Sequence, residues 1–132
     1  WRGPWAGISR TNWILTNIDK SPKISDAKKT QYKGEAHFLR GLYYFNLVRL
    51  FGDVPWIDKQ QTASDDLQVS RTSKDIVYQH IIDDFSDAAS MLPAVYENTT
   101  DIGRATKGAA FGLLAKVYLT LKRYNESWSL FS

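Results

Sequence analysis

The longest patterned segment of the chain, residues 28–51, carries apolar side chains on almost every side of a helical turn. It lacks a purely polar face, although Gly34 and Gly41 interrupt its run of large side chains. A helix that is apolar on most sides must be covered by other elements on most sides. The segment therefore predicts a central helix in an all-helical packing, ended by Gly52 and Pro55.

Shorter helical patterns lie on both sides of this segment. The first covers residues 4–18, where Pro4 suits the first turn because its missing N–H would be unpaired there anyway. The second begins with Thr72 or Ser73 as the N-cap and repeats apolar residues every three or four positions until Pro93. Both patterns predict helices that pack one apolar face on the central helix.

Two more helical patterns follow, over residues 104–122 and from Tyr124 to the end of the chain. The segments between the patterns are polar or contain proline, and we expect connectors at 19–27, 56–70 and 94–103. The longest of them, 56–70, predicts a surface loop of the kind that often carries function.

An internal repeat relates two of the predicted helices. Shifting the central segment along the chain superposes small residues on small ones and tyrosine on tyrosine: Gly34 on Gly108, Ala36 on Ala110, Leu39 on Leu113, Gly41 on Ala115, Tyr44 on Tyr118 and Leu47 on Leu121. The spacing of Leu114, Ala115, Tyr118 and Ser127 is also that of a tetratricopeptide repeat, whose small residues let paired helices approach closely. The sequence thus predicts an all-α fold of stacked helical hairpins resembling degenerate tetratricopeptide repeats, as a single helical domain over residues 1–132.

Composition supports a packed domain and excludes several kinds of site. Of the 132 residues, 43% are hydrophobic and 14% aromatic, which is enough for a core and unlike a disordered chain. The net charge of +3 is spread too evenly for a nucleic-acid face. The chain has no cysteine, its two histidines fall in different helices, and no apolar run approaches the roughly 18 residues that span a membrane. We therefore expect no metal and no cofactor.

Charged residues on the central segment predict ion pairs or hydrogen bonds to loops. Glu35, Arg40 and Arg49 lie on a mostly apolar helix, where an unpaired charge would be costly. We therefore expect each of them to have a partner, as an ion pair or as a tie to a loop.

Catalysis by paired carboxylates is not predicted. Asp65-Asp66 and Asp83-Asp84 are adjacent pairs that could suggest the acids of a glycosidase. Neighbouring positions on a helix point apart, however, whereas a glycosidase needs two carboxyl groups facing each other across roughly 5 to 10 Å. The chain is therefore expected not to be an enzyme.

Three segments of the chain, in order, resemble the motifs of the SusD/RagB family. Residues 34–55 read GEAHFLRGLYYFNLVRLFGDVP, residues 71–93 begin RTSKDIVY and end in Leu-Pro, and residues 103–119 read GRATKGAAFGLLAKVYL. Members of this family are surface-exposed outer-membrane lipoproteins of Bacteroidetes that bind glycans or other nutrients and pass them to a TonB-dependent transporter. They run to several hundred residues and carry a signal peptide and a lipidated N-terminal cysteine.

The resemblance implies a function, a partner and a location. The chain is expected to be part of a non-catalytic glycan- or nutrient-binding component of a SusC/SusD-type uptake system, with a SusC-like transporter as its partner. It would reach the membrane only through a lipid anchor that the present sequence does not contain, so the chain is expected to be an N-terminal portion of a longer protein.

Tryptophans are the candidate ligand-binding residues. Sugars stack their C–H faces on aromatic rings while their hydroxyls pair with polar side chains. SusD-like proteins commonly place part of an aromatic binding arc near the start of the first helix, so Trp1, Arg2 and Trp5 are candidates, and Trp56 opens the long polar loop. The alternative for Trp5 is core packing, because it shares a helix face with Ile8 and Leu15; Trp13 and Trp128 are expected in the core.

Two other functions stay open at this point. A free-standing tetratricopeptide-like adaptor would bind peptides in a groove and would continue with regular repeats. A carbohydrate-active enzyme would need a facing pair of carboxylates, which this segment lacks.

Overall fold

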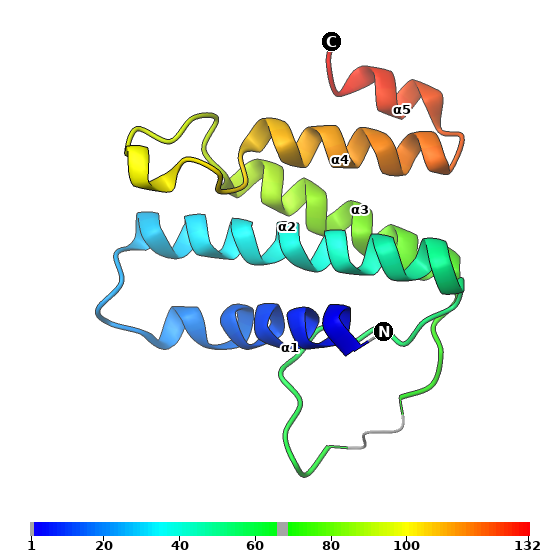
Figure 1. Ribbon diagram of the computed structural model, residues 1–132, viewed down its shortest axis with the longest axis horizontal. Helices are drawn as coiled ribbons and strands as arrows, with labels where there is room; N and C mark the ends of the chain where they lie inside the picture. Colours follow the sequence, from blue (N-terminus) through cyan, green and yellow to red (C-terminus); the bar gives the residue numbers. More distant parts are fainter. Residues whose placement is uncertain (1, 66–68) are drawn as a thin grey trace.

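The computed structural model describes residues 2–65 and 69–132 and shows an all-α fold, as predicted (Figure 1). The helices are α1 (Arg2–Asn17), α2 (Asp26–Phe51), α3 (Lys74–Met91), α4 (Lys107–Thr120) and α5 (Tyr124–Ser129). Two short 3₁₀ turns, η1 (Ile18–Lys20) and η2 (Thr99–Asp101), lie in the connectors.

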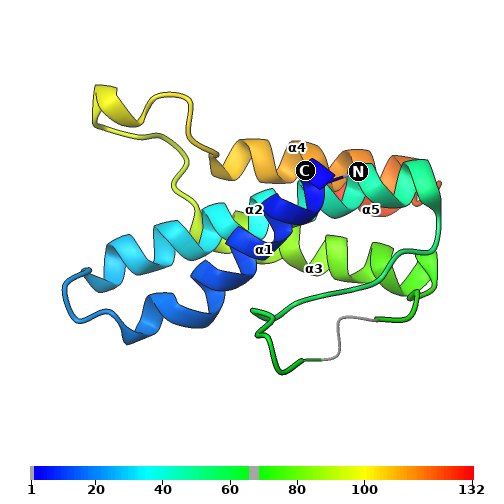
Figure 2. The ribbon, with the colours of Figure 1, turned by 60° about the horizontal axis from the view of Figure 1, so that its bottom comes forward.

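Helix α2 lies at the centre of the packing, as its sequence predicts. Each helix runs antiparallel to the one before it (Figure 1). Helices α1 and α4 lie on opposite sides of α2, and α3 lies behind α2 in the first view (Figures 1 and 2). The main contacts join α2 to α3, α1 to α2, α3 to α4 and α4 to α5. This is the predicted stack of helical hairpins.

Several helix boundaries differ from the prediction by two or three residues, and capping explains the starts of α2 and α4. Helix α2 begins at Asp26 rather than at residue 28, because the Ser25 hydroxyl caps it by accepting from the Lys28 N–H at 3.3 Å. Helix α4 begins at Lys107 rather than at Arg104, because Thr106 is its N-cap and accepts from the N–H three residues later. Gly52 ends α2 with φ at 67°, as its position predicted.

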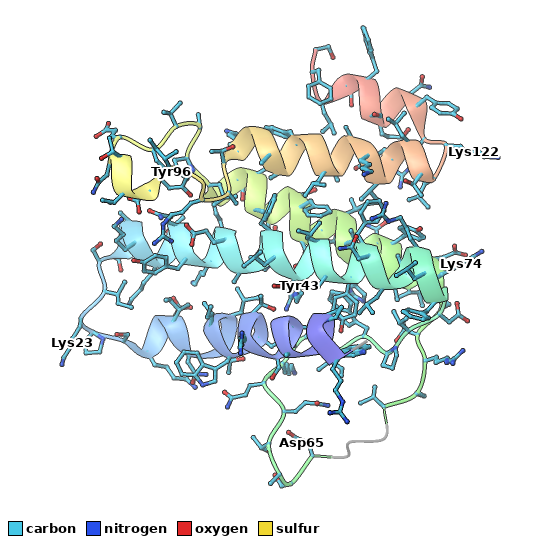
Figure 3. The ribbon with its side chains drawn as sticks, viewed as in Figure 1. Lys23, Tyr43, Asp65, Lys74, Tyr96 and Lys122 are labelled. Atoms are coloured by element: carbon cyan, nitrogen blue, oxygen red, sulfur yellow. The ribbon has the colours of Figure 1, made fainter. Side chains whose placement is uncertain are left out.

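The core lies where α2 and α3 cross. Its largest fully buried side chains include Tyr44 and Phe45 from α2 and Phe85 from α3. Gly41 allows the close approach, since a Cβ there would lie 3.0 Å from the Phe85 ring. On the other side of α2, Gly7 of α1 lies against the ring of Tyr43, between the two helices (Figure 3).

The repeat between α2 and α4 is also visible in burial. Ala36 and Ala110 are both buried, as are Gly41 and Ala115. Ser127, which stands where a tetratricopeptide repeat usually has alanine, is buried against α4 and donates to the Ala115 carbonyl at 3.2 Å. The small positions therefore mark close helix packing at these two pairs, whereas Gly34 is buried and its counterpart Gly108 is exposed.

The connector between α2 and α3 is a loop closed at its base. Val54 and Thr72 form an antiparallel bridge, and the Asp53 carboxylate accepts from the Lys74 N–H at 2.8 Å. Helix α3 thus has Ser73 at its N-cap position as predicted, but the capping oxygen belongs to Asp53. Asp65 lies near the far end of this loop, away from the helices (Figure 3).

The connector between α3 and α4 is tied to α2 through Glu35. Arg104 Nη1 lies 3.0 and 3.2 Å from the two Glu35 carboxylate oxygens, and the Tyr96 hydroxyl contacts Glu35 at 3.3 Å and donates to the Ala105 carbonyl at 2.6 Å. Burial and the neighbouring Glu35 charge raise the pKa of Tyr96 to about 12, so its hydroxyl stays protonated at physiological pH. This is one of the loop ties that the sequence predicted for the charges of α2.

Candidate functional site

A buried ion pair joins α2 to α3. Arg40 and Asp84 are only 7% and 2% exposed, and the guanidinium donates to both carboxylate oxygens, at 2.8 and 2.7 Å. His37 Nδ1 lies 2.8 Å from the same carboxylate. Burial alone would lower the pKa of Arg40, but the hydrogen bond and charge of Asp84 raise it, so Arg40 stays cationic.

The same guanidinium reaches the loop that follows α2. Arg40 Nη1 donates to Asn12 Oδ1 of α1 at 3.0 Å and to the Asp58 carbonyl at 3.3 Å. The Asn12 amide in turn donates to the Ile57 carbonyl at 2.8 Å. Side chains from two helices therefore hold the backbone of two successive loop residues.

Tyr44 of α2 also holds the loop backbone. Its hydroxyl accepts from the Ile57 N–H at 2.8 Å and contacts the Ile57 carbonyl at 3.2 Å. Burial raises the pKa of Tyr44 well above its ordinary value, so the group remains a neutral hydroxyl. We call Asn12, Arg40 and Tyr44 the loop anchor.

Tyr44→Phe tests the loop anchor without removing the ring from the core. The variant leaves the partly buried Ile57 N–H without its acceptor, although the Ile57 carbonyl keeps the Asn12 amide as a donor. We expect it to lower the free energy of unfolding by about 1 to 3 kcal/mol. Limited proteolysis should cut residues 59–65 faster than in the parent chain. Tyr124→Phe, at an exposed tyrosine of α5, is the matched control and should change neither measurement.

A hollow of about 210 Å³ lies between α1 and the fastened part of the loop. Its apolar lining is Trp5, Ile8 and Ile57, and its polar lining is Ser9, Asn12, Lys59 and Gln61. The hollow is smaller than the roughly 300 to 1,000 Å³ of sites for drug-sized ligands. It offers room for one sugar-sized ring, with an aromatic wall and polar groups at its edge.

The predicted binding residues within the described part of the chain have different surroundings. Trp5 lines the hollow and also packs edge-on against the Tyr44 ring, at 5.9 Å between centroids, so it has a core contact while its glycan-binding role stays a prediction. Arg2 is exposed on α1, on the same side as Trp5 three residues later. Trp1 lies outside the described residues. Trp56 is in the loop, as expected, but its ring is largely engaged within the chain.

Trp56 stacks on His80 at 4.2 Å and lies 4.3 Å from the Tyr44 ring, with the Arg40 guanidinium 5.4 Å away. These contacts cover the ring faces that a sugar would need, so the structure favours a packing role for Trp56. Its indole N–H is buried, without a hydrogen-bond partner in the described part of the chain.

The core positions predicted for Trp13 and Trp128 are wrong. Trp13 is 56% exposed and Trp128 is 77% exposed. Trp13 follows the buried pair Thr11 and Asn12, so its side chain lies on the outer side of α1, and Trp128 follows Ser127, the residue of α5 that packs against α4.

Arg49 has partners, and Asp83 and Asp84 point apart, as the sequence predicted. Arg49 finds partners in the Asn46 side chain at 2.6 Å and the Phe45 ring at 4.1 Å. Asp83 is exposed and accepts from Gln79, whereas the neighbouring Asp84 is buried on Arg40, so the two carboxylates point apart. Asp66, the partner of Asp65 in the other acidic pair, lies outside the described residues.

Several residues of the site were not identified from sequence. Ser9, Lys59 and Gln61 are ordinary polar residues until the loop is placed beside α1. Asn12 offered a signal, because a polar residue on the apolar face of a helix is expected to have a partner.

The described residues lack a membrane-spanning helix and a metal-binding cluster. They contain no helix long and apolar enough to cross a membrane. They also contain no group of three or more histidine, aspartate or glutamate side chains placed to hold a metal ion.

Comparisons with known proteins place this fold in one family. Residues 1–119 match the model of the SusD-like family described as starch-binding and associating with the outer membrane. A SusD-like protein of Bacteroides ovatus is 32% identical over 128 residues, which make up 96% of this chain and 23% of that protein. The chain thus spans about a quarter of the length of such relatives.

Solved structures agree with the sequence comparison. A SusD-like protein of Bacteroides fragilis superposes with a TM-score of 0.92 at 35% identity, over 98% of this chain and 25% of that one. A laminarin-binding SusD-like protein also gives a TM-score of 0.92, at 32% identity, over 98% of this chain and 28% of its own. The chain belongs to the SusD-like family.

Proposed function

We propose that this chain is part of a non-catalytic glycan-binding component of an outer-membrane nutrient uptake system, which presents its ligand to a TonB-dependent SusC-like transporter. The observation that carries the proposal is the family match over residues 1–119, whose description names starch binding and the outer membrane. Relatives named for what they bind include a starch-binding protein of Bacteroides thetaiotaomicron and the laminarin-binding protein.

Within the chain, we assign sugar contact to the hollow beside Trp5. The indole supplies an apolar surface on which the C–H face of a sugar can stack, and Ser9 and Gln61 supply groups for its hydroxyls. The loop anchor holds the opposite wall of the hollow in place. Preorganisation of this kind favours binding because the loop has already lost its freedom before the ligand arrives.

The transporter and the membrane anchor belong to the same proposal. The chain spans about a quarter of its relatives, so further ligand contacts and the lipidated cysteine would lie in other parts of a longer protein. Intact-mass analysis of the native protein from membranes of the source cell tests this directly. A chain of several hundred residues that begins with a lipid-modified cysteine supports the proposal, and an unlipidated protein of about this size contradicts it.

Trp5→Ala tests the assignment of the hollow. On the polysaccharide that retards the parent chain most in affinity electrophoresis, we expect binding about five- to thirtyfold weaker, because the stacking surface is lost. Trp128→Ala, at an exposed tryptophan of α5, should leave binding unchanged. Trp5→Phe keeps an aromatic ring against Tyr44 and should bind at an intermediate level, with far-UV circular dichroism to verify folding.

Equal retardation of Trp5→Ala and the parent chain would contradict the assignment of sugar contact to the hollow. A tetratricopeptide-like adaptor would show a different pattern, with binding to peptides and no retardation by any polysaccharide.

A further inference from the structure

The hollow beside Trp5 has an uneven charge. Its lining includes the cation Lys59 and no aspartate or glutamate. Arg2 adds a second cation on the same side of α1, close to one turn before Trp5. A ligand in the hollow would therefore meet positive charge and no neighbouring carboxylate from the lining.

Some cations of the described residues are neutralised by an acidic partner, and these two are not. Lys33, Arg104 and Arg123 each form an ion pair with a carboxylate, at 2.7 to 3.0 Å. Within residues 2–65 and 69–132, neither Lys59 nor Arg2 forms an ion pair. Lys59 also lines the neighbouring hollow of the loop, whose lining includes Asp58 and Asp65, but no ion pair joins it to either carboxylate.

The backbone that carries Lys59 is held on both sides. Before it, the loop anchor binds Ile57 and Asp58. After it, the Gln60 side chain accepts from the Asn17 amide of α1 at 2.8 Å. The loop on both sides of Lys59 is therefore held by α1 and α2, which places Lys59 in the lining of the hollow.

From this arrangement we infer that the hollow takes an anionic sugar, whose carboxylate or sulfate pairs with Lys59 while its ring lies against Trp5. The inference rests on the proposed function and adds the class of ligand to it. A charge-assisted hydrogen bond to a carboxylate or sulfate is stronger than one to a hydroxyl, so Lys59 discriminates acidic from neutral glycans.

Affinity electrophoresis with four named polysaccharides tests the inference. Polygalacturonate supplies carboxylates, chondroitin sulfate supplies carboxylates and sulfates, and starch and laminarin are neutral. We expect one of the anionic polymers to retard the chain more than either neutral polymer. Lys59→Gln should then weaken that binding about five- to tenfold, while Lys59→Arg, which keeps the charge, should stay within about twofold of the parent.

Lys116→Gln is the matched control for general attraction between a basic chain and an acidic polymer. It removes the same charge from an exposed position of α4, a helix that makes no contact with α1. Site-specific recognition predicts an unchanged affinity for this variant, whereas equal losses in Lys59→Gln and Lys116→Gln would overturn the inference.

The other outcomes separate the ligand class from the function. Stronger binding to starch or laminarin that depends on Trp5 would overturn the inference and leave the glycan-binding proposal standing. Retardation by none of the four polymers would contradict both. Raising the salt concentration gives a second readout, because it should weaken binding to the anionic polymer through charge screening and leave neutral glycans unaffected.

Discussion

Replacing Arg40 with methionine is expected to lower the free energy of unfolding by about 3 to 5 kcal/mol, as measured by urea denaturation. The variant keeps most of the side-chain volume but leaves the Asp84 carboxylate buried without its bidentate partner. It also removes the donor to Asn12 and to the Asp58 carbonyl. A loss of this size would show that the ion pair and the loop anchor are one unit.

Two further variants separate this effect from a general loss of charge. Arg40→Met combined with Asp84→Leu removes both charges, so it should be clearly more stable than Arg40→Met alone. Arg123→Met breaks an exposed ion pair with Glu126 and should change stability little. If Arg40→Met unfolds at the same urea concentration as the parent chain, the buried pair does not have the structural role assigned to it.

Phe85→Ala is expected to lower the free energy of unfolding by about 3 to 5 kcal/mol, a loss similar to that of Arg40→Met. Phe85 is fully buried, lies beneath Gly41 of α2 and meets the Phe38 ring edge-on at 6.0 Å between centroids. Its removal leaves a cavity at the crossing of α2 and α3, which are the two helices in most extensive contact.

Gly41→Ala provides a sharper test of the same crossing, because the sign of its effect depends on Phe85. Alanine favours a helix over glycine by about 1 kcal/mol, but a Cβ at this position lies 3.0 Å from the fully buried ring of Phe85. The substitution should therefore destabilise the parent chain and stabilise the Phe85→Ala variant. If Gly41→Ala changes the free energy of unfolding in the same direction in both backgrounds, contact with the Phe85 ring does not determine whether alanine is tolerated at position 41.

Most of the fold could be predicted because its determinants are local or periodic. The apolar sides of residues 28–51 predicted a central α2, and two of the three small positions shared with α4 predicted close helix packing correctly. The starts and caps of the helices depend on single side chains. Ser25 and Thr106 cap their helices as sequence rules allow, whereas the cap of α3 comes from Asp53, twenty-one residues before the N–H that it accepts.

The site could be predicted only in part, because it is formed by tertiary contacts. Trp5 was identified from its residue type and its place on the first helix, and it does line a hollow. Trp56 has the same chemistry and an exposed-looking loop position, yet Tyr44 and His80 occupy its ring. Lys59 gave no signal at all, since its place beside α1 follows from loop contacts that no local pattern encodes.

Chemical-shift mapping on the nitrogen-15-labelled chain tests the central claim most directly. The indole N–H groups of the tryptophans give separate resonances, which single Trp→Phe variants assign. On titration with oligosaccharides of the polysaccharide that retards the chain most, the account predicts that the Trp5 indole resonance shifts saturably while those of Trp13 and Trp128 stay in place. Saturable shifts confined to Trp13 or Trp128, or no indole shift with any glycan, would contradict glycan binding at this hollow.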